Sequence, residues 1–303
     1  MARRAVVAQA EHVTAVPMPV SLEALLDHLV DYAGLFPPAS LAMPDAVRAY
    51  ASYRGSPRAE MLGRFVLPAG RLDEFASQAR TVVTPGDPWH LSVLAAAGDE
   101  PALAAFERAM TGLAVIDAVE AKVGAPSEVQ AFAGGRRVFV EVPLDIDPLP
   151  FVAEISRHGL SAKARTGGVT NESFPTAIDV ARFIAACAVY GVPFKATAGL
   201  HHPLRGEYLL TYAHESPHGT MFGFLNVFVA AVLARGGMAP PELVAVLEER
   251  AASAFSFDDD GLAWRGRRAT ADAVRETRRQ FAISFGSCSF AEPVDDLTAL
   301  SLL

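Results

Sequence analysis

The sequence predicts an α/β protein of the (β/α)8 class, the TIM-barrel architecture, and three observations lead to that prediction. Short runs rich in β-branched and aromatic residues alternate with amphipathic helical windows along the chain. The windows are long enough for helices that cross over between parallel strands. A length of 303 residues with 51% hydrophobic content suits one large core. We therefore expect a single barrel domain over residues 1–303 rather than an open, doubly wound sheet.

Seven strands follow from the local pattern, and an eighth remains to be found. The seven runs are Gly63–Pro68, His90–Ala96, Leu113–Ala121, Arg136–Val142, Leu160–Arg165, Pro193–Ala198 and Phe281–Gly286. We expect the eighth strand within residues 1–60, which otherwise form an N-terminal extension with helical spacing over residues 21–36. A weaker candidate, Ala254–Trp264, contains an acidic glycine turn that is more typical of a hairpin.

Helices are predicted between the strands. One window has Pro175 where a first helical turn tolerates it and Gly191 as a stop signal, as expected for a crossover helix. Residues 200–270 separate the last two predicted strands and carry helices of their own, so we expect a helical insertion over the barrel mouth. The apolar run at 221–234 is shorter than the ~20 residues of a membrane span and contains Asn226, which favours a core helix. A homo-oligomer interface is the alternative use of this run.

Composition narrows the class of function. The formal net charge of −8, with no clustered basic face, argues against nucleic acid as a partner. Cys187 and Cys288 are too few for the disulfide framework of a secreted domain. Glu11 and His12 interrupt the start before it forms the apolar run of a signal peptide. We expect a cytoplasmic protein that acts on a small molecule, away from membranes.

Two lysines stand out among the candidate functional residues. Lys163 and Lys195 each lie near the end of a predicted strand and each precede a glycine turn. In a barrel, functional groups gather at the carboxyl ends of the strands. Desolvation there favours the neutral amine, the form that attacks carbonyl groups. The alternative is that each lysine is a core residue in a salt bridge with Glu120, Glu141 or Asp117.

Five segments resemble, in order, the strands of deoxyribose-phosphate aldolase and its class I aldolase relatives. They are VIDAV at 115–119, RVFVEV at 137–142, KARTGG at 163–168, KATAGLHH at 195–202 and FGSCSF at 285–290. The resemblance covers roughly residues 113–200 and 281–298. It implies that Lys163 forms a Schiff base without a cofactor, that Lys195 depresses the pKa of Lys163, and that Asp117 is the acid/base group.

The resemblance also implies a set of substrate-binding turns. Gly286 and Ser287 match a turn that binds the substrate phosphate through backbone amides, together with the turn at Gly199. Gly167 and Gly168 follow the first lysine. The chain departs from the family where Ala198 replaces a glycine, which puts phosphate specificity in doubt.

Three charged residues near the lysines have open assignments. Glu120 has the opposite strand parity to Asp117, so one of the two is the inward carboxylate. Glu141 either orients Lys163 through an ion pair or is structural. Arg165 shares the strand face of Lys163, and it either binds a substrate carboxylate or pairs with Glu141.

A histidine-rich segment offers a rival site. His201, His202, His214 and His218 lie at the start of the insertion, and such clustering is typical of zinc or iron sites. His201 and His202 also follow Lys195 closely enough to contact the same substrate. Cys288 is either a nucleophile or, more typically, a packing residue.

The leading hypothesis is therefore a class I, Schiff-base aldolase-like lyase that acts on a small keto or aldehyde metabolite. The first alternative is a metal-dependent hydrolase or isomerase that uses the four histidines with Glu141. The second is a non-catalytic barrel that binds a metabolite, since a fold alone does not imply an activity.

Overall fold

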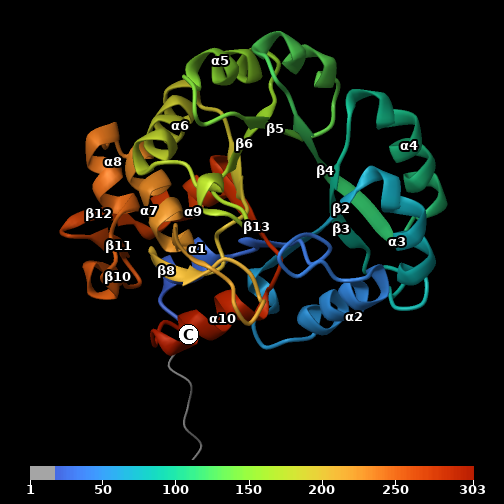
Figure 1. The fold of residues 1–303 in the computed structure, drawn as a ribbon, viewed down its shortest axis with the longest axis horizontal. Helices are drawn as coiled ribbons and strands as arrows, with labels where there is room; N and C mark the ends of the chain where they lie inside the picture. The colour runs from blue at the N-terminus through green and yellow to red at the C-terminus, as the bar shows by residue number, and fades with distance from the viewer. Residues whose placement is uncertain (1–17) are drawn as a thin grey trace, which may run out of the picture.

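A computed structural model describes residues 18–303 and contains a closed barrel of eight parallel strands, ordered β1-β13-β7-β6-β5-β4-β3-β2 (Figure 1). The predicted fold class is confirmed. The barrel strands are β1 (Val30–Tyr32), β2 (Leu62–Pro68), β3 (Trp89–Leu94), β4 (Ala114–Lys122), β5 (Val138–Val142), β6 (Ser161–Arg165), β7 (Phe194–Thr197) and β13 (Ala282–Ser287). The expectation about Glu11 and His12 concerns the start of the chain, outside the described residues.

The eighth strand lies within the first sixty residues, as predicted. β1 closes the barrel, because Val30 pairs with Phe285 of β13 on one side and with Leu62 of β2 on the other. The helical prediction for residues 21–36 was wrong beyond α1 (Val20–Leu26). β1 has only three residues and all are buried, so no alternation of exposed and buried positions marks it as a strand.

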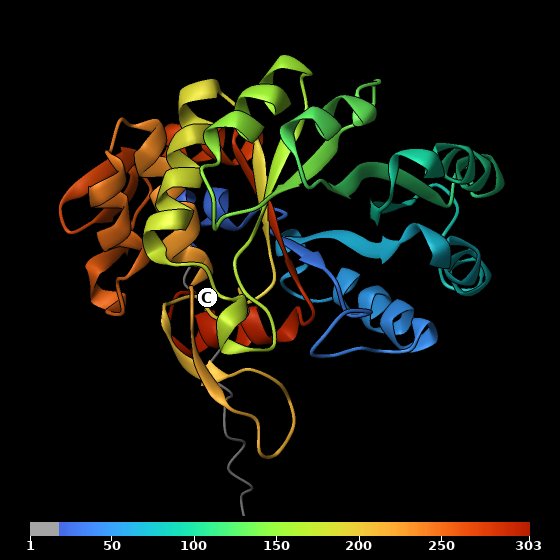
Figure 2. The same ribbon diagram turned by 45° about the horizontal axis from the view of Figure 1, so that its top comes forward.

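Helices form a ring around the strands (Figure 1), and Figure 2 shows the same arrangement from a tilted view. They are α2 (Met43–Arg54), α3 (Leu72–Ala79), α4 (Glu100–Ala109), α5 (Leu149–Arg157), α6 (Ala177–Tyr190), α7 (Phe224–Arg235), α8 (Pro240–Leu247), α9 (Ala271–Gln280) and α10 (Ala291–Ala299). A short 3₁₀ segment, Pro126–Phe132, follows β4. α2 connects β1 to β2, so the predicted N-terminal extension includes the first βα unit of the barrel.

α6 shows how local sequence sets the ends of a crossover helix. Thr176 is the N-cap, and its hydroxyl and the Asp179 carboxylate form a capping box. Pro175 therefore precedes the N-cap. It lies two residues before Ala177, the first residue of the helix, and not in the first turn as predicted. Gly191 ends the helix at φ 63°, a left-handed conformation that glycine adopts without strain. By length and composition alone, residues Asn171–Tyr190 would be apolar enough to cross a membrane, but here α6 packs against α5, α7 and α8.

The segment between β7 and β13 has two parts with different locations. An antiparallel hairpin, β8 (Gly206–Leu209) and β9 (His218–Met221), carries Tyr212 to the barrel mouth, where it contacts Cys288 and Glu292. A separate antiparallel sheet of β10 (Phe255–Phe257), β11 (Gly261–Trp264) and β12 (Arg267–Thr270) packs against α1, α7 and α9. The predicted hairpin at 254–264 is present in this sheet. Only the first part of the insertion therefore lies at the mouth.

α7 is the apolar helix predicted for the core. Every residue from Phe224 to Ala234 is buried within one chain. The Asn226 side chain fixes this helix, because its amide nitrogen donates to the Val246 and Glu249 carbonyls, both at 2.8 Å. Its oxygen accepts from the Arg205 backbone N–H at 2.9 Å. Core packing and these hydrogen bonds account for the composition of the run.

The apolar core lies between the strands and the helix ring. Tyr50, Phe65 and Trp89 show its character, with ring centroids 5.4 Å apart for Tyr50 and Phe65 and 4.8 Å for Tyr50 and Trp89. Charged and polar side chains occupy part of the barrel interior instead, including Lys163 and Lys195. Apolar residues therefore pack the strands against the helices, and charged side chains lie inside the barrel.

Replacing Asn226 tests this account of the α7 packing. Asn226→Leu leaves buried backbone groups without partners, so we expect the free energy of unfolding to fall by about 3 kcal/mol. Urea denaturation measures the change. Val189→Ala on the exposed side of α6 is the control, with an expected change within about 0.5 kcal/mol. Equal stability of Asn226→Leu and wild type would contradict the role given to the amide.

Candidate active site

The two lysines lie side by side inside the barrel. Their Cα atoms are paired across β6 and β7, so both side chains point inward from the same level. The same level continues through Glu141, paired with Lys163, and Ser284, paired with Lys195. Lys163 is 4% exposed and Lys195 is 0% exposed. A buried ammonium needs a carboxylate partner, and acidic residues inside the barrel supply it.

Glu120 bridges the two lysines. Its Oε1 lies 2.6 Å from Lys195 Nζ, and its Oε2 lies 3.1 Å from Lys163 Nζ. Ser92 donates a further hydrogen bond to Oε1 at 2.7 Å. Both carboxylate oxygens are therefore occupied. Between the two acidic candidates on β4, Glu120 is the one that lies beside the lysines.

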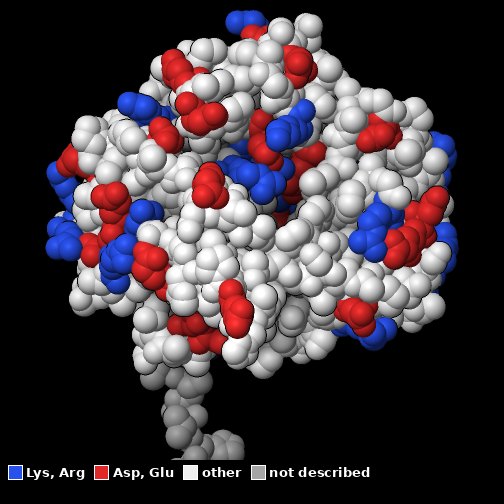
Figure 3. Space-filling view, in the orientation of Figure 1, with Lys and Arg blue, Asp and Glu red and all other residues white. Residues whose placement is uncertain are grey.

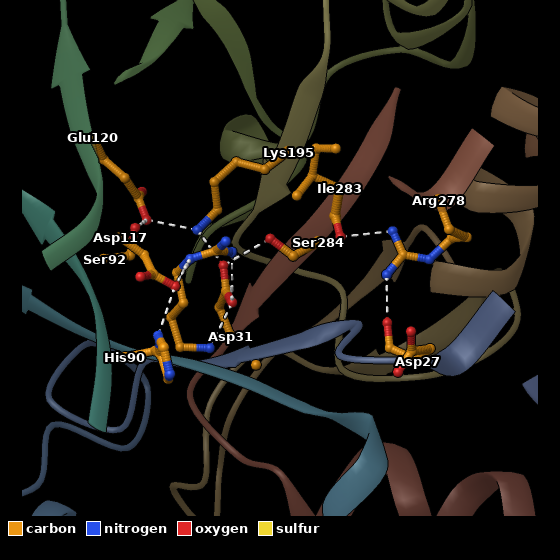
Figure 4. A network of polar contacts seen from close by, with 12 residues as sticks. Asp27, Asp31, His90, Ser92, Asp117, Glu120, Lys195, Arg278, Ile283 and Ser284 are labelled. Carbon is orange, nitrogen blue, oxygen red and sulfur yellow. Dashed lines mark hydrogen bonds and ion pairs between the residues drawn. The ribbon is translucent and has the colours of Figure 1, made fainter. Parts of the chain in front are cut away.

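Asp31 is a second carboxylate that pairs with Lys195, and it was not among the residues predicted from the sequence. Its Oδ2 lies 2.6 Å from Lys195 Nζ and accepts from Ser284 Oγ at 2.7 Å (Figure 4). Its Oδ1 accepts from the Arg64 backbone N–H at 2.8 Å. The signal in the sequence was an acidic residue between Val30 and Tyr32, two good strand formers, three residues before Gly34. Ser92 and Ser284 carried no comparable signal.

Glu141 completes the surroundings of Lys163. Its Oε2 lies 2.9 Å from Lys163 Nζ, and its Oε1 is 3.5 Å from Arg165 Nε. Arg165 therefore pairs with Glu141, one of the two alternatives for this residue. Its side chain is still 53% exposed, so the guanidinium remains accessible to a ligand. Glu141 thus connects the buried lysine to a solvent-facing cation.

The charges shift one another strongly. Burial by itself raises the pKa of Glu120, but Lys195 and Lys163 outweigh burial and hold it well below its usual range. The pKa of Asp31 is lowered in the same way, chiefly by Lys195. Burial lowers the pKa of Lys163, as expected from its strand, yet Glu120 and Glu141 reverse the effect and raise it. The expectation that desolvation makes Lys163 neutral is therefore wrong for the resting protein.

Asp117 lies away from the lysines. It forms ion pairs with Arg64 at 3.5 Å and with His90 at 3.0 Å. The physical reason is a shift of register in β4, where Ile116 pairs with Leu91 and Ala118 with the next residue, so that Asp117 is the extra residue. It lines a different cavity, together with residues from the starts of β2 and β3. Its predicted place beside Lys163 is not what the structure has.

A cavity of about 270 Å³ opens at the carboxyl ends of the strands, with Lys163 and Glu120 in its lining. Figure 3 shows acidic and basic side chains gathered in a hollow at the centre of one face. Phe36, Val66 and Leu94 provide apolar walls. Lys163 therefore contacts the cavity, whereas Lys195 is fully covered. The size suits a small metabolite with a few polar groups.

The predicted glycine turns divide between lining and packing. Gly168 and Gly286 line the cavity. Gly167 and Gly199 pack backbone against backbone, since a Cβ added to Gly167 would lie 3.0 Å from the Gly199 Cα. Ala198 has φ 63°, so this turn has the left-handed conformation although its residue carries a side chain.

The four histidines do not come together. His201 lines the cavity, and its Nδ1 lies 3.3 Å from Ser287 Oγ. His202 stacks on Tyr208 with centroids 3.5 Å apart and bonds to Asp296 at 2.6 Å. His214 and His218 are exposed in the hairpin region. Within residues 18–303 no three His, Cys, Asp or Glu side chains are arranged to hold a metal ion, so the histidine-based zinc or iron site has no assembled ligand set.

Comparisons of the chain with protein-family models, with curated proteins and with solved structures found no match.

Removing Lys195 tests how far the interior charges depend on one another. Lys195→Met leaves Asp31 without its closest cation and Glu120 with only one, so we expect the free energy of unfolding to fall by about 3–5 kcal/mol. Lys122→Met, an exposed lysine at the end of β4, is the matched control and should change it by less than about 0.5 kcal/mol. Chemical denaturation of both variants decides, and equal stabilities would show that the pairing carries no net stability.

The pKa shifts also predict how stability depends on pH. Glu120, Asp31 and Glu141 have lowered folded-state pKa values, so their contribution is complete above the unfolded value, about 4.3 for glutamate, and is lost as the pH falls from there. Lys163 has a raised pKa, so its contribution is complete below about 10.4 and is lost as the pH rises through the folded value. Unfolding measured from pH 2 to 11 should show a plateau between these limits. In Glu141→Gln the acid limb should become shallower, and an unchanged limb would contradict the assignment.

Proposed function

We propose that the protein is a class I aldolase-like lyase in which Lys163 forms an imine with a small keto or aldehyde substrate. The observation that carries the proposal is the position of Lys163, whose amine lines the cavity between Glu120 and Glu141 while Lys195 lies covered beside it. A single reactive amine in contact with a small cavity, with carboxylates to take its proton, is the arrangement that imine formation needs.

Residue usage supports the same proposal. The chain has 26 Lys and Arg residues together, of which only Lys122, Lys163 and Lys195 are lysines. Two of these three are buried inside the barrel. Arginine is the usual residue for buried ion pairs, and it is the basic residue used almost everywhere else in this chain. Only a primary amine forms an imine, so lysine at these positions fits chemistry better than charge pairing alone.

The steps follow from the charges around Lys163. The ammonium first gives a proton to Glu141, and the free amine attacks the substrate carbonyl carbon. Loss of water leaves a protonated imine, which accepts the electron pair of the adjacent C–C bond when that bond breaks. An enamine and a free aldehyde result. Protonation of the enamine carbon and hydrolysis of the imine release the second product and restore the amine.

Lys195 has a supporting part in this scheme. Glu120 is shared by both lysines, so the Lys195 ammonium remains as its partner when Lys163 becomes neutral. The carboxylate therefore never lies buried without a cation during the cycle. Lys195 therefore keeps the charge of Glu120 paired beside the imine.

Arg165 indicates the kind of substrate that fits. Its guanidinium is half-exposed, lines the cavity and has one long ion pair at 3.5 Å to Glu141. A substrate carboxylate offers it a better, bidentate partner. A 2-oxo acid with its ketone at Lys163 and its carboxylate at Arg165 satisfies both groups, and a simple aldehyde uses Lys163 alone.

Reductive trapping tests the proposal. Wild-type protein incubated with borohydride and acetaldehyde, acetone, dihydroxyacetone or pyruvate should gain the mass of one reduced adduct, mapped by peptide mass spectrometry to Lys163. The small number of lysines makes the mapping unambiguous. Lys163→Met should lose the adduct, whereas Lys122→Met should keep it. No adduct with any of the four carbonyls, or an adduct confined to Lys122, would overturn the proposal, and binding of a carbonyl without an adduct would favour the metabolite-binding alternative.

A further inference from the structure

A second group of titratable side chains faces the same cavity from the loops that follow β7 and β13. His201 and Cys288 both line it, and neither has a part in the imine steps. His201 is 8% exposed, and its Nδ1 lies 3.3 Å from Ser287 Oγ, 3.3 Å from Glu292 Oε2 and 4.0 Å from Cys288 Sγ. Within residues 18–303, the polar contacts of His201 are made by Nδ1, which leaves Nε2 for a molecule in the cavity.

The orientation of the His201 ring is fixed by two residues from other elements. Glu292 lies at the start of α10, and its Oε2 also accepts a hydrogen bond from Tyr212 Oη at 3.0 Å. Tyr212 comes from the β8–β9 loop and lies 3.5 Å from Cys288 Sγ. A carboxylate at Nδ1 keeps a proton on that nitrogen, so proton exchange takes place at Nε2. Histidine held in this way is a common acid/base group.

We infer that His201 exchanges a proton through Nε2 with the β-hydroxyl oxygen of a substrate bound as an imine on Lys163. Glu292 and Tyr212 are positioning residues that hold the ring. The substrate class is then a β-hydroxy ketone or β-hydroxy aldehyde. This inference rests on the proposed imine chemistry and adds the second proton-transfer group that carbon–carbon cleavage needs.

The bonds and protons of this step balance. In cleavage, Nε2 takes the hydroxyl proton, and the O–H electron pair becomes the second bond of the released aldehyde carbonyl. The Cα–Cβ bond breaks, and its electron pair moves to form the enamine and neutralise the imine nitrogen. In condensation the same steps run in reverse, and the His201 imidazolium returns the proton to the new hydroxyl. No oxidant or reductant is involved.

Glu120 is poorly suited to this task although it lines the cavity. Both of its oxygens are occupied, one by Lys195 and Ser92 and the other by Lys163. The lysines hold its pKa well below its usual range, which makes it a weak base. His201 has an uncommitted ring nitrogen. Lys163 and its carboxylate partners therefore act at the imine, and His201 exchanges the proton of the leaving aldehyde.

The surroundings of His201 predict the direction of the pH dependence. Burial lowers the pKa of His201, but contacts with Cys288 and Glu292 outweigh burial and raise it to about 9. The other titratable groups near the ring are Tyr212 and His202, whose ring centroid lies 6.4 Å away. Cleavage needs the neutral imidazole, so its rate should rise with pH up to about 9. Condensation needs the imidazolium and should decline above that pH.

The test separates imine formation from carbon–carbon cleavage in the full chain. The probes are acetaldehyde and pyruvate for borohydride trapping, and 3-hydroxybutanal and 4-hydroxy-2-oxopentanoate for release of acetaldehyde. His201→Asn should trap adducts at Lys163 as the wild type does, but cleave about 100-fold more slowly and without the rising pH limb. His202→Asn is the matched control and should keep both steps, because His202 is held by Tyr208 and Asp296 and does not line the cavity.

A second variant tests the positioning role through the pH profile. Glu292→Gln removes one of the two groups, Cys288 and Glu292, that raise the His201 pKa, so the rising limb of cleavage should move to lower pH, and Glu292→Asp should move it back. An unmoved limb overturns the inference even if His201→Asn fails to fold.

The possible results separate the role of His201 from the imine chemistry of Lys163. Trapping at Lys163 together with wild-type cleavage and pH profile in His201→Asn overturns the role of His201 and leaves the imine chemistry standing. No trapping of either carbonyl by the wild type overturns the imine chemistry, and the role of His201 with it.

Discussion

The interaction on which the rest of the site depends is the bridge that Glu120 makes between two buried ammonium groups. Charges inside a protein are tolerated only when they are paired and hydrogen-bonded, so one such bridge demands a complete set of partners. Asp31 and Glu141 supply the remaining negative charge, and serines from β3 and β13 satisfy the outer lone pairs. Together with Glu120 and the two lysines, these residues come from seven different strands, so the barrel must be closed before the charges are satisfied.

This dependence also fixes the register of the barrel. A slip of one residue in β6 or β7 would turn a lysine toward the apolar helix layer and leave carboxylates unpaired, which is far more costly than misplacing an alanine. Ala162 and Ala164 flank Lys163, so the apolar side chains of β6 specify little by themselves, whereas Phe194 and Ala196 flank Lys195 on β7. The charged layer costs free energy to bury, but it makes the observed register of these strands much more stable than a register shifted by one residue.

Alternation along the chain was sufficient to predict the barrel, and the strand-end rule was sufficient to select Lys163 and Lys195. What could not be predicted depended on contacts between distant segments. β1 is too short to show a period, which hid Asp31. Because the register shifts beside Asp117, strand parity alone could not predict the positions of Asp117 and Glu120 on β4. His201 and His202 are neighbours in sequence, yet one enters the cavity and the other stacks on Tyr208. The raised pKa of Lys163 required the positions of its two carboxylates, which the sequence of one strand does not contain.

The ion pairs inside the barrel extend beyond the cavity. Asp117 contacts Arg64, Arg64 lies 3.7 Å from Asp31, and Asp31 contacts Lys195, which shares Glu120 with Lys163. Figure 4 shows Asp117, Asp31, Lys195 and Glu120 of this series. Charges of alternating sign therefore form a continuous row from the cavity at the starts of β2 and β3 to the one at the strand ends. In a medium of low polarisability, neutralising one member changes the field at the next without any movement of the backbone. The two cavities are thus joined by a row of paired charges, so a change of charge beside Asp117 would alter the field at Asp31, Lys195 and Glu120, and through Glu120 the field at Lys163.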